Sequence, residues 1–380
     1  MATLTGNAFL RSPYWVTISN NFQLSATIEL WIYEGVKNVD RPTTPQYTLT
    51  SVSPNVGDDI FIDISELGRD YIESVYDGDY TCNAVWVDYR YTQVIDGGSD
   101  IVSSIFTLAG YNGYGYYEDG RNWQNEEGKM FSNNVFYKRA DLPIRIPVDS
   151  DSTDTVDFIY KGVSQIKKTI TDSFDVSGNL VTYATNNTTD YDTFKERVLA
   201  EGGVFVDSPC MQKFYENSVL FPVDEVIIKS TNEKTFIKVY NNDACKYPAY
   251  KITFTNKFGI EQDIWFFKMS KLSMKVNRKD FSRNTLSSYL NDDISKHQDV
   301  SFNTTAKESL RLNSDWVSED YNEVFRQLML SETVWITYNE QVLPINIKDS
   351  SFNYKTTVND KLINYTINIE FSFDKINNVR

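Results

Sequence analysis

A chain of 380 residues is too long for one small hydrophobic core, so two or three domains are expected. Hydrophobic residues make up 41% of the chain and charged residues 23%, a balance typical of globular proteins. The net charge of −15 argues against nucleic-acid and membrane partners, because so acidic a surface repels phosphate backbones and anionic lipids.

The same composition favours strands over helices, because 25 Tyr and 23 Phe are residues that pack well on pleated surfaces. The opening sequence MATLTGNAFLRSPYW has no basic segment followed by an apolar run, so no signal peptide is expected. Apolar runs stay far below the roughly 20 residues of a membrane span. Cys82, Cys210 and Cys245 are odd in number and widely spaced, which predicts free thiols and no disulfide framework.

Residues 1–147 are predicted to form an N-terminal β-sandwich domain. Short segments of alternating polarity are separated by turn residues, a spacing typical of sandwiches and barrels. In Ala26–Tyr33 every second residue is aliphatic, which predicts a strand with one face in a core. The expected strands are Tyr14–Ser19, Ser25–Tyr33, Gln46–Thr50, Asp59–Ile64, Tyr80–Tyr91 and Asp100–Ala109.

Residues 148–246 are predicted to form a middle β-rich domain. It begins with the acidic run DSDSTDTVD (Asp149–Asp157), which indicates a linker or an exposed turn. Tyr191–Ala200 is expected to be helical, because three apolar residues share a face and Gly202 and Gly203 can end it. The expected strands are Asp157–Tyr160, Ser164–Thr171, Leu180–Ala184, Glu225–Lys229 and Thr235–Asn241.

Residues 247–380 are predicted to form a C-terminal α+β assembly domain that ends in an antiparallel meander. Ser318–Ser331 has apolar residues at helical spacing, and Ser318 is placed to cap a helix over 318–331. Lys361–Phe373 alternates without a break over about 13 residues, longer than the usual 5–6, which suits a hairpin that reaches a neighbouring subunit. The other expected strands are Lys251–Asn256, Asp263–Ser270, Thr333–Tyr338, Gln341–Lys348 and Ser351–Thr357.

Together these elements predict a mainly β protein of antiparallel β-sandwich domains, with long hairpins and one or two short helices.

Few residues carry recognisable chemistry. The sole histidine, His297, lies in the polar segment DDISKHQDV and is expected to face solvent. The acidic run Asp149–Asp157 invites a calcium hypothesis, but an EF-hand loop needs Gly and Glu at its sixth and twelfth positions, which hold Asp154 and Tyr160. No cofactor, no metal and no catalytic residue is therefore predicted.

The stretch YNGYGYYEDGRNWQNEEG (Tyr111–Gly128), called here the aromatic loop, leaves three alternatives open. An ordinary loop or a contact surface for another subunit is favoured, because tyrosines on loops supply contact area at low entropic cost. A glycan could instead stack on its aromatic rings. The third alternative is a glycosidase pair drawn from Asp119, Glu126 and Glu127, although a glycine-rich loop would hold such carboxylates poorly.

A basic cluster stands out against the acidic chain. It consists of Lys268, Lys271, Lys275, Arg278, Lys279 and Arg283. Such a stripe can complement an acidic face on another copy or partner, or it can simply be a solvated polar face.

Three segments of the C-terminal part resemble virion proteins of tailed phages that infect Bacteroidota, including the crAss-like phages. They are YPAYKITFTNKFGIEQDIWFFKMSKLSMKVNRKDF (Tyr247–Phe281), SDWVSEDYNEVFRQLMLSETVWI, and the end of the chain from VLPINIKDSS onwards. FLRSPYWVTISN, IELWIYEG and AVWVDYRY resemble the N-terminal β-domain of the same group.

This resemblance implies a non-enzymatic structural subunit of a tail, baseplate or neck ring, assembled in the host cytoplasm and located in the virion. Its expected partners are further copies of itself and other virion proteins; a host-surface glycan bound at the tail tip is the alternative. The residues expected at interfaces are Tyr111, Tyr114, Tyr116, Tyr117 and Trp123 in the aromatic loop, and Tyr365, Ile367, Ile369 and Phe371 in the last strand.

Overall fold

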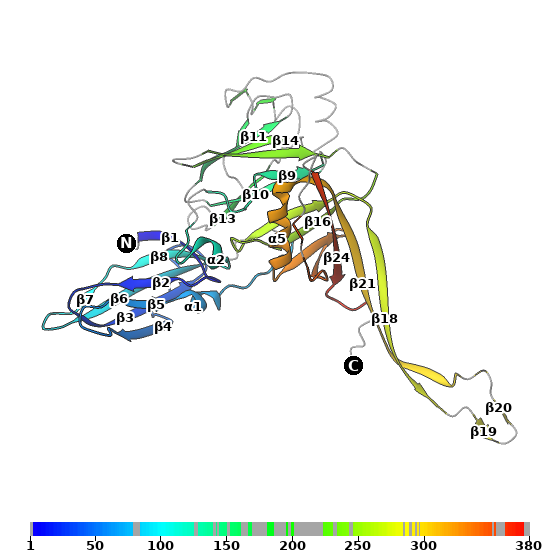
Figure 1. Cartoon of the computed structure of the whole chain (residues 1–380), viewed down its shortest axis with the longest axis horizontal. Helices are drawn as coiled ribbons and strands as arrows, with labels where there is room; N and C mark the ends of the chain where they lie inside the picture. The colour runs from blue at the N-terminus through cyan, green and yellow to red at the C-terminus, as the bar shows by residue number, and fades with distance from the viewer. Residues whose placement is uncertain are drawn as a thin grey trace. The chain divides into compact units, whose positions relative to one another are not determined.

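The computed structural model describes most of the chain, which folds into two compact units (Figure 1). The first unit comprises Met1–Ala244, Thr253–Ile264 and Asp320–Glu332, and the second comprises Cys245–Ile252, Trp265–Glu319 and Thr333–Arg380. The described residues are 3–78, 84–124, 128–139, 142, 144–149, 153–160, 166–168, 181–185, 195–196, 199–200, 223–230, 234–242, 246–283, 286–288, 291–292, 295, 297–351, 353–354 and 362–375.

The first unit begins with a β-sandwich. Its larger sheet has the order β1-β8-β6-β3-β4, with β7 paired to β6, and the smaller sheet pairs β2 with β5. All these pairs are antiparallel except β1–β8. The strands are β1 (Thr3–Phe9), β2 (Trp15–Ile18), β3 (Gln23–Tyr33), β4 (Tyr47–Val52), β5 (Ile60–Asp63), β6 (Ala84–Ile95), β7 (Ile101–Val102) and β8 (Phe106–Tyr111).

The core between these two sheets confirms the alternation seen in the sequence. Ile28 and Leu30 of β3 are fully buried and share one cluster with Val16 of β2 and Ile62 of β5. On the other face of β3, the hydroxyls of Thr27 and Thr50 form a cross-strand hydrogen bond of 2.9 Å. Burying each aliphatic side chain contributes about 1.5–3 kcal/mol, so one face of β3 holds the sheets together. The short helix α1 (Ser65–Arg69) follows β5.

A second sandwich follows in the first unit, between the pair β10-β13 and the sheet β12-β11-β14-β15-β9. Side chains of both sheets share one hydrophobic cluster, which includes Ile146 of β10 and Phe158 of β11. The strands are β9 (Val135–Lys138), β10 (Arg145–Asp149), β11 (Thr153–Tyr160), β12 (Ile166–Lys168), β13 (Val181–Thr185), β14 (Val223–Ser230) and β15 (Lys234–Asn241).

The described part of Asp149–Asp157 contradicts the prediction of a linker or exposed turn. Asp149 ends β10, and β11 begins at Thr153. Asp157 is fully buried on the face of β11 opposite to that of Val156 and Phe158, and its carboxylate forms an ion pair with Lys229 of β14. Asp149 is also buried and accepts a hydrogen bond of 3.0 Å from the side chain of Asn7.

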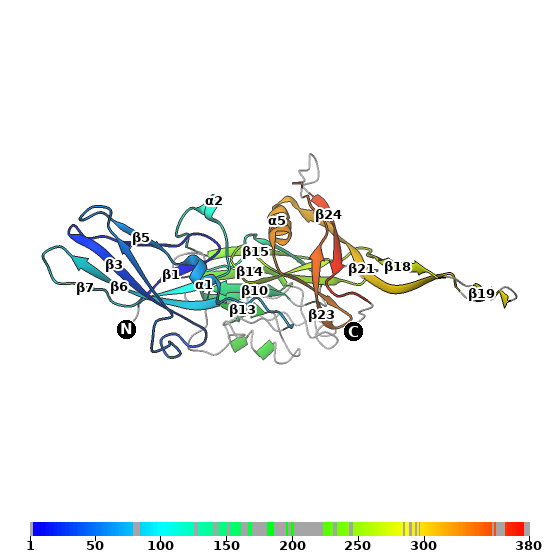
Figure 2. The same ribbon diagram turned by 90° about the horizontal axis from the view of Figure 1, so that it is seen from below.

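The second unit contains most of a seven-stranded sheet of order β17-β16-β22-β23-β24-β21-β18, whose strands β16 and β17 have residues in both units. β18 and β21 run side by side as one long hairpin, with β19 and β20 at its far end in Figure 1 and β19 at the same end in Figure 2. The strands are β16 (Tyr250–Thr255), β17 (Glu261–Phe266), β18 (Lys271–Ser282), β19 (Leu286–Ser288), β20 (Asn291–Asp292), β21 (Asp299–Ser318), β22 (Val334–Tyr338), β23 (Gln341–Ile347) and β24 (Leu362–Phe371).

The predicted helix over 318–331 is present but starts later. β21 extends to Ser318, a 3₁₀ turn covers Glu319–Tyr321, and α5 spans Asn322–Leu330. Its N-cap is Tyr321 and has no side-chain capping bond, so the expected cap by Ser318 is wrong. The predicted apolar face is confirmed, since Tyr321, Val324, Phe325 and Leu328 are all buried.

The prediction of a mainly β protein built from antiparallel sheets with few short helices is confirmed. The domain boundaries differ from those predicted. The 147/148 boundary falls inside β10, and α5 belongs to the first unit instead of the C-terminal part. Among the described residues, no helix combines the length and apolarity needed to cross a bilayer.

Some expected elements lie partly or wholly outside the described residues. The predicted helix Tyr191–Ala200 is described at four positions only, and the three cysteines are not described. Of the predicted strand Ser351–Thr357, the described residues Ser351, Asn353 and Tyr354 are not in a strand.

Candidate functional site

The aromatic loop is fixed to the first unit at several points. The backbone N–H of Tyr114 donates to the carbonyl of Lys257 at 2.9 Å. The hydroxyl of Ser12 accepts bonds from the N–H groups of Gly115 and Tyr116, at 2.9 and 3.0 Å. Further along, Asn122 pairs through its amide with both backbone groups of Trp15 at 2.8 Å. The described part of the loop is therefore held in place by residues of its own unit.

Glycines let the loop lie against the β16–β17 turn. Gly259 in that turn has a φ of +82°, and a Cβ added to it would lie 2.6 Å from the backbone nitrogens of Asn112 and Gly113. A Cβ on Gly113 would in turn lie 2.8 Å from the carbonyl oxygen of Lys257. Such a close approach of two backbones leaves no space for a side chain on either residue.

Two of the five rings predicted to be contact surface pack against other aromatic rings of the first unit. Tyr111 is fully buried and stacks on Phe9, with ring centroids 5.9 Å apart. Trp123 stacks on the same Phe9 at 4.2 Å and contacts Phe258 at 5.4 Å. The ammonium of Lys257 lies 4.7 Å from the centre of the Trp123 ring, within the range of a cation–π interaction.

Of the remaining three rings, two are exposed. Tyr117 is 98% exposed and Tyr116 47% exposed, both on the short helix α2 (Tyr116–Asp119). Tyr114 is partly buried, and desolvation raises the pKa of its phenol to about 12. A neighbouring protein or a glycan at this loop would therefore meet Tyr116 and Tyr117 first.

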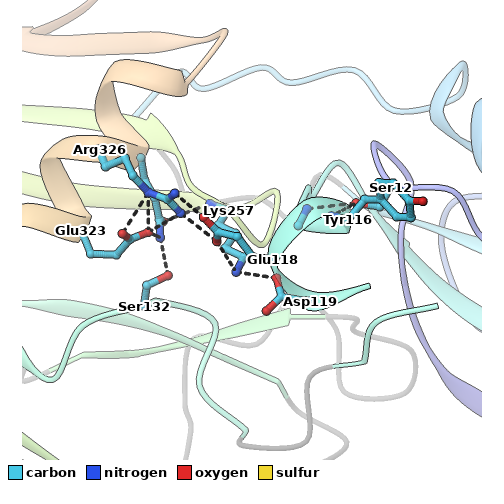
Figure 3. A network of polar contacts seen from close by, with 10 residues as sticks. Ser12, Tyr116, Glu118, Asp119, Ser132, Lys257, Glu323 and Arg326 are labelled. Carbon is cyan, nitrogen blue, oxygen red and sulfur yellow. Dashed lines mark hydrogen bonds and ion pairs between the residues drawn. The ribbon is translucent and has the colours of Figure 1, made fainter. Parts of the chain in front are cut away.

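A network of charged side chains ties α2 to the β16–β17 turn and to α5 (Figure 3). The ammonium of Lys257 lies 2.6 Å from the carboxylate of Asp119 and 3.3 Å from that of Glu118. The guanidinium of Arg326 donates to Glu118 through two nitrogens, one of them at 2.9 Å, and to Glu323 at 3.0 Å. Three segments far apart in sequence thus meet in one set of ion pairs.

Gln327 extends this network towards the second sandwich. Its amide nitrogen donates to Glu323 at 2.9 Å and to the hydroxyl of Ser132, and its amide oxygen accepts the backbone N–H of Lys257 at 3.1 Å. Gln327 is buried, so each of these bonds satisfies a polar group that water cannot reach.

The network favours the ionised form of Glu118. The hydrogen bond from Arg326 lowers the pKa of Glu118 to about 2, and Lys257 acts in the same direction. A glycosidase general acid needs the opposite shift, a raised pKa. Asp119 is engaged by Lys257, while Glu126 and Glu127 lie outside the described residues. As described, the arrangement suits a structural clamp better than a proton donor.

The lowered pKa of Glu118 predicts a pH-dependent contribution to stability. The contribution is fully present above the ordinary pKa of 4.5 and is lost as the pH falls towards about 2. Because Glu118 is 43% exposed, we expect Glu118→Gln to cost less than about 1 kcal/mol at pH 7. Denaturant unfolding at pH 7, 4.5 and 2.5 should show this cost shrinking. Glu34→Gln, at an exposed glutamate, is the matched control, and a cost that does not change with pH would contradict the prediction.

The four predicted interface residues of the last strand form part of the core of the second unit. Ile367 and Ile369 of β24 lie opposite Leu312 and Leu310 of β21 and are buried. Tyr365 and Phe371 are buried as well. These side chains are covered by their own chain, and whether any of them also contacts a partner stays a prediction.

The other sequence candidates are placed as follows. His297 is exposed, as expected, and its carbonyl accepts a bond of 2.9 Å from the side chain of Arg283. Among the described residues no group of three His, Cys, Asp or Glu is arranged to hold a metal ion. The basic cluster lies on or next to β18, whose twelve residues are all exposed.

Lys257, Arg326 and the β18–β21 hairpin were not predicted from the sequence. The hairpin has a signal that could have found it: Leu272, Met274 and Val276 alternate with polar residues, and so do Leu310 and Leu312. The ion pairs had no such signal, because their partners are 139 and 208 positions apart in the chain.

Comparisons with known proteins give little. No family model matches the sequence, and no curated protein matches it. Among solved structures the chain is similar to extracellular domains 3–5 of Drosophila OTK, at 9% sequence identity and a TM-score of 0.21, over 79% of this chain and 88% of that one. A TM-score this low carries no argument about fold or function.

Proposed function

We propose that this chain is a structural, non-enzymatic subunit of a bacteriophage virion, located in the tail, baseplate or neck. In this proposal it assembles with copies of itself into a ring and binds other virion proteins. The resemblance of its segments to virion proteins of Bacteroidota phages motivates the proposal. The sandwich architecture of the first unit agrees with it, because such domains serve as rigid building blocks without a catalytic site.

One observation supports the proposal above the others: the long hairpin of β18 and β21. Its outer strand presents twelve consecutive exposed residues, among them Leu272, which is 50% exposed, and Met274, which is 58% exposed. A two-stranded hairpin is marginally stable in water by itself. Exposed apolar side chains along such a hairpin are typical of a surface that another protein covers.

The aromatic loop offers a glycan less exposed ring surface than the alternative of a glycan-binding module at the tail tip assumed. Of its five proposed stacking rings, Tyr111 is buried and Trp123 stacks on Phe9, so Tyr116 and Tyr117 are the rings most open to a sugar. Two neighbouring tyrosines on a four-residue helix form a small platform. We therefore keep the structural subunit as the proposed function.

The test is to purify intact particles of the phage that encodes the chain and examine them by mass spectrometry and cryo-electron microscopy. The expected result is that the chain is a stoichiometric component, located in a closed ring in which the β18–β21 hairpin contacts a neighbouring subunit. Absence of the chain from purified particles would refute the proposal. So would a single isolated copy that contacts no neighbour through this hairpin.

A further inference from the structure

The β18–β21 hairpin contains an arm, defined here as β18 together with residues 299–311 of β21. The two strands pair in antiparallel register from Lys271 opposite Arg311 to Ser282 opposite Asp299. β18 is the last strand in the sheet order, so its outer edge has no strand beside it among the described residues. An edge strand of twelve exposed residues needs either a cover or protection against unwanted pairing.

The arm has two unlike faces because successive side chains of a strand point to opposite sides. Lys271, Lys275 and Lys279 lie on one face, and Arg311 and Lys307 stand opposite the first two on β21. The other face carries Leu272, Met274 and Val276, all exposed. No ion pair among the described residues involves the three lysines of β18, so the chain does not compensate these charges locally.

The charge of the arm is opposite to that of the rest of the protein. The arm contains six Lys or Arg and three Asp or Glu, a net charge of +3. Since the whole chain carries −15, the remainder carries −18. A polyanion such as nucleic acid would be attracted by the arm but repelled by this remainder. A second copy of the chain offers the arm an acidic surface without that conflict.

One acidic surface of suitable chemistry lies in the first sandwich. The segment Asp58–Asp77, called here the acidic segment, contains seven carboxylates and a single basic residue, Arg69. Its exposed carboxylates are Asp58, Asp59, Glu66, Asp70, Glu73 and Asp77. Exposed apolar side chains lie between them, namely Phe61, Tyr71 and Val75. The segment therefore matches the lysine face of the arm in charge.

We infer that the arm of one copy docks along the acidic segment of a second copy, with Lys271, Lys275 and Lys279 facing its carboxylates. The contact joins two different surfaces, so repeating it adds copies in one direction and closes a ring when the rotation permits. This inference deepens the self-association within the proposed function and rests on it. Lysines spaced along the outer strand also disfavour direct strand addition, so side chains carry the recognition.

The test measures self-association of the full-length protein by analytical ultracentrifugation at low and high salt. The arm variant is Lys271→Glu with Lys275→Glu and Lys279→Glu, and the segment variant is Glu66→Lys with Asp70→Lys and Glu73→Lys. The combined variant carries all six changes. The control is Lys234→Glu with Lys238→Glu and Lys246→Glu, which reverses three exposed lysines outside the arm. Circular dichroism checks that each variant is folded.

The wild type is expected to associate, and more weakly at high salt because ions screen exposed charges. The arm and segment variants should each raise the dissociation constant at least about tenfold, because each turns three attractive, exposed charge pairs into repulsive ones. The combined variant should recover most of this loss of affinity, because each charge pair is restored with opposite sign. The control should change the dissociation constant less than about threefold, because its lysines lie outside the proposed contact.

Several outcomes would overturn the inference: a wild type that stays monomeric at high concentration, an arm variant that associates like the wild type, or a combined variant without recovery. Arm-dependent binding of duplex DNA or of anionic vesicles, with no self-association, would also overturn it. Association through another surface would overturn the docking but leave the proposed function standing. Absence of the chain from purified particles would refute the function, whatever the arm does in solution.

Discussion

Replacing Gly259 with alanine is expected to lower the free energy of unfolding by about 3 kcal/mol or more. The φ of +82° costs an L-residue about 1–2 kcal/mol by itself. The new Cβ would also lie 2.6 Å from two backbone nitrogens of the aromatic loop, so the loop or the turn has to move. Moving either disturbs the bond between the N–H of Tyr114 and the carbonyl of Lys257. Denaturant unfolding of the full-length protein measures the loss.

Gly120→Ala is the matched control for this prediction. Gly120 lies in the same loop at a φ of +85°, and a Cβ there would meet nothing within 4 Å. It should therefore cost only the backbone strain of its φ of +85° and ψ of −167°, about 1–3 kcal/mol. The difference between the two variants isolates the close approach of loop and turn, and equal losses would show that this approach is absent.

Phe9→Ala is expected to lower the free energy of unfolding by about 3–5 kcal/mol, the usual range for removing a buried phenylalanine. Phe9 is buried at the end of β1 and contacts Tyr111, Trp123 and Phe258. Its loss leaves a cavity beneath Trp123, whose ring then loses a stacking partner at 4.2 Å. Besides the unfolding midpoint, the fluorescence of the native state should shift to longer wavelength as Trp123 becomes more hydrated.

Phe22→Ala makes the same substitution where the side chain is 60% exposed, and we expect it to cost less than about 1 kcal/mol. A Phe9→Ala variant no less stable than Phe22→Ala would contradict the assignment of Phe9 as the residue that anchors the aromatic loop. It would also reopen Trp123 as a ring available to a ligand.

Sequence patterns predicted strands best where one face of a strand is buried. The alternation of Ala26, Ile28, Leu30 and Ile32 corresponds to a fully buried face of β3. The terminal strand is confirmed with shorter bounds, as β24 spans ten residues instead of thirteen. In both strands one face packs on a continuous core, which fixes the register. The alternation of apolar and polar residues along these strands is therefore clear in the sequence.

The same patterns failed where tertiary partners outweighed local composition. The acidic composition around Asp157 indicates a solvated linker, yet Asp157 is buried and pairs with Lys229 on another strand. β18 gives only a short apolar alternation among many charged residues. Both of its faces are exposed, so neither face needs a continuous apolar pattern. A strand that is not half-buried gives a weak periodic signal.

The aromatic loop shows which part of a site could not be predicted from the sequence. Its composition indicated contact area, and the sequence left the partner open. The described contacts show that much of that area is used by the loop's own unit, through Phe9, Phe258 and Lys257. These residues come from segments that no local pattern links to the loop, so the pairing could not be predicted from the sequence.

The unbroken length of β21 gives the second unit a mechanical property. The strand pairs with β18 in the arm and continues into the sheet, where it pairs with β24 from Ser309 to Ser318. A force pulling on the arm would load these antiparallel hydrogen bonds lengthwise, in shear, so that many of them must break at once. Bonds loaded one after another, as in unzipping, yield at much lower force. Tension applied to the arm is therefore expected to pass along β21 into the sheet.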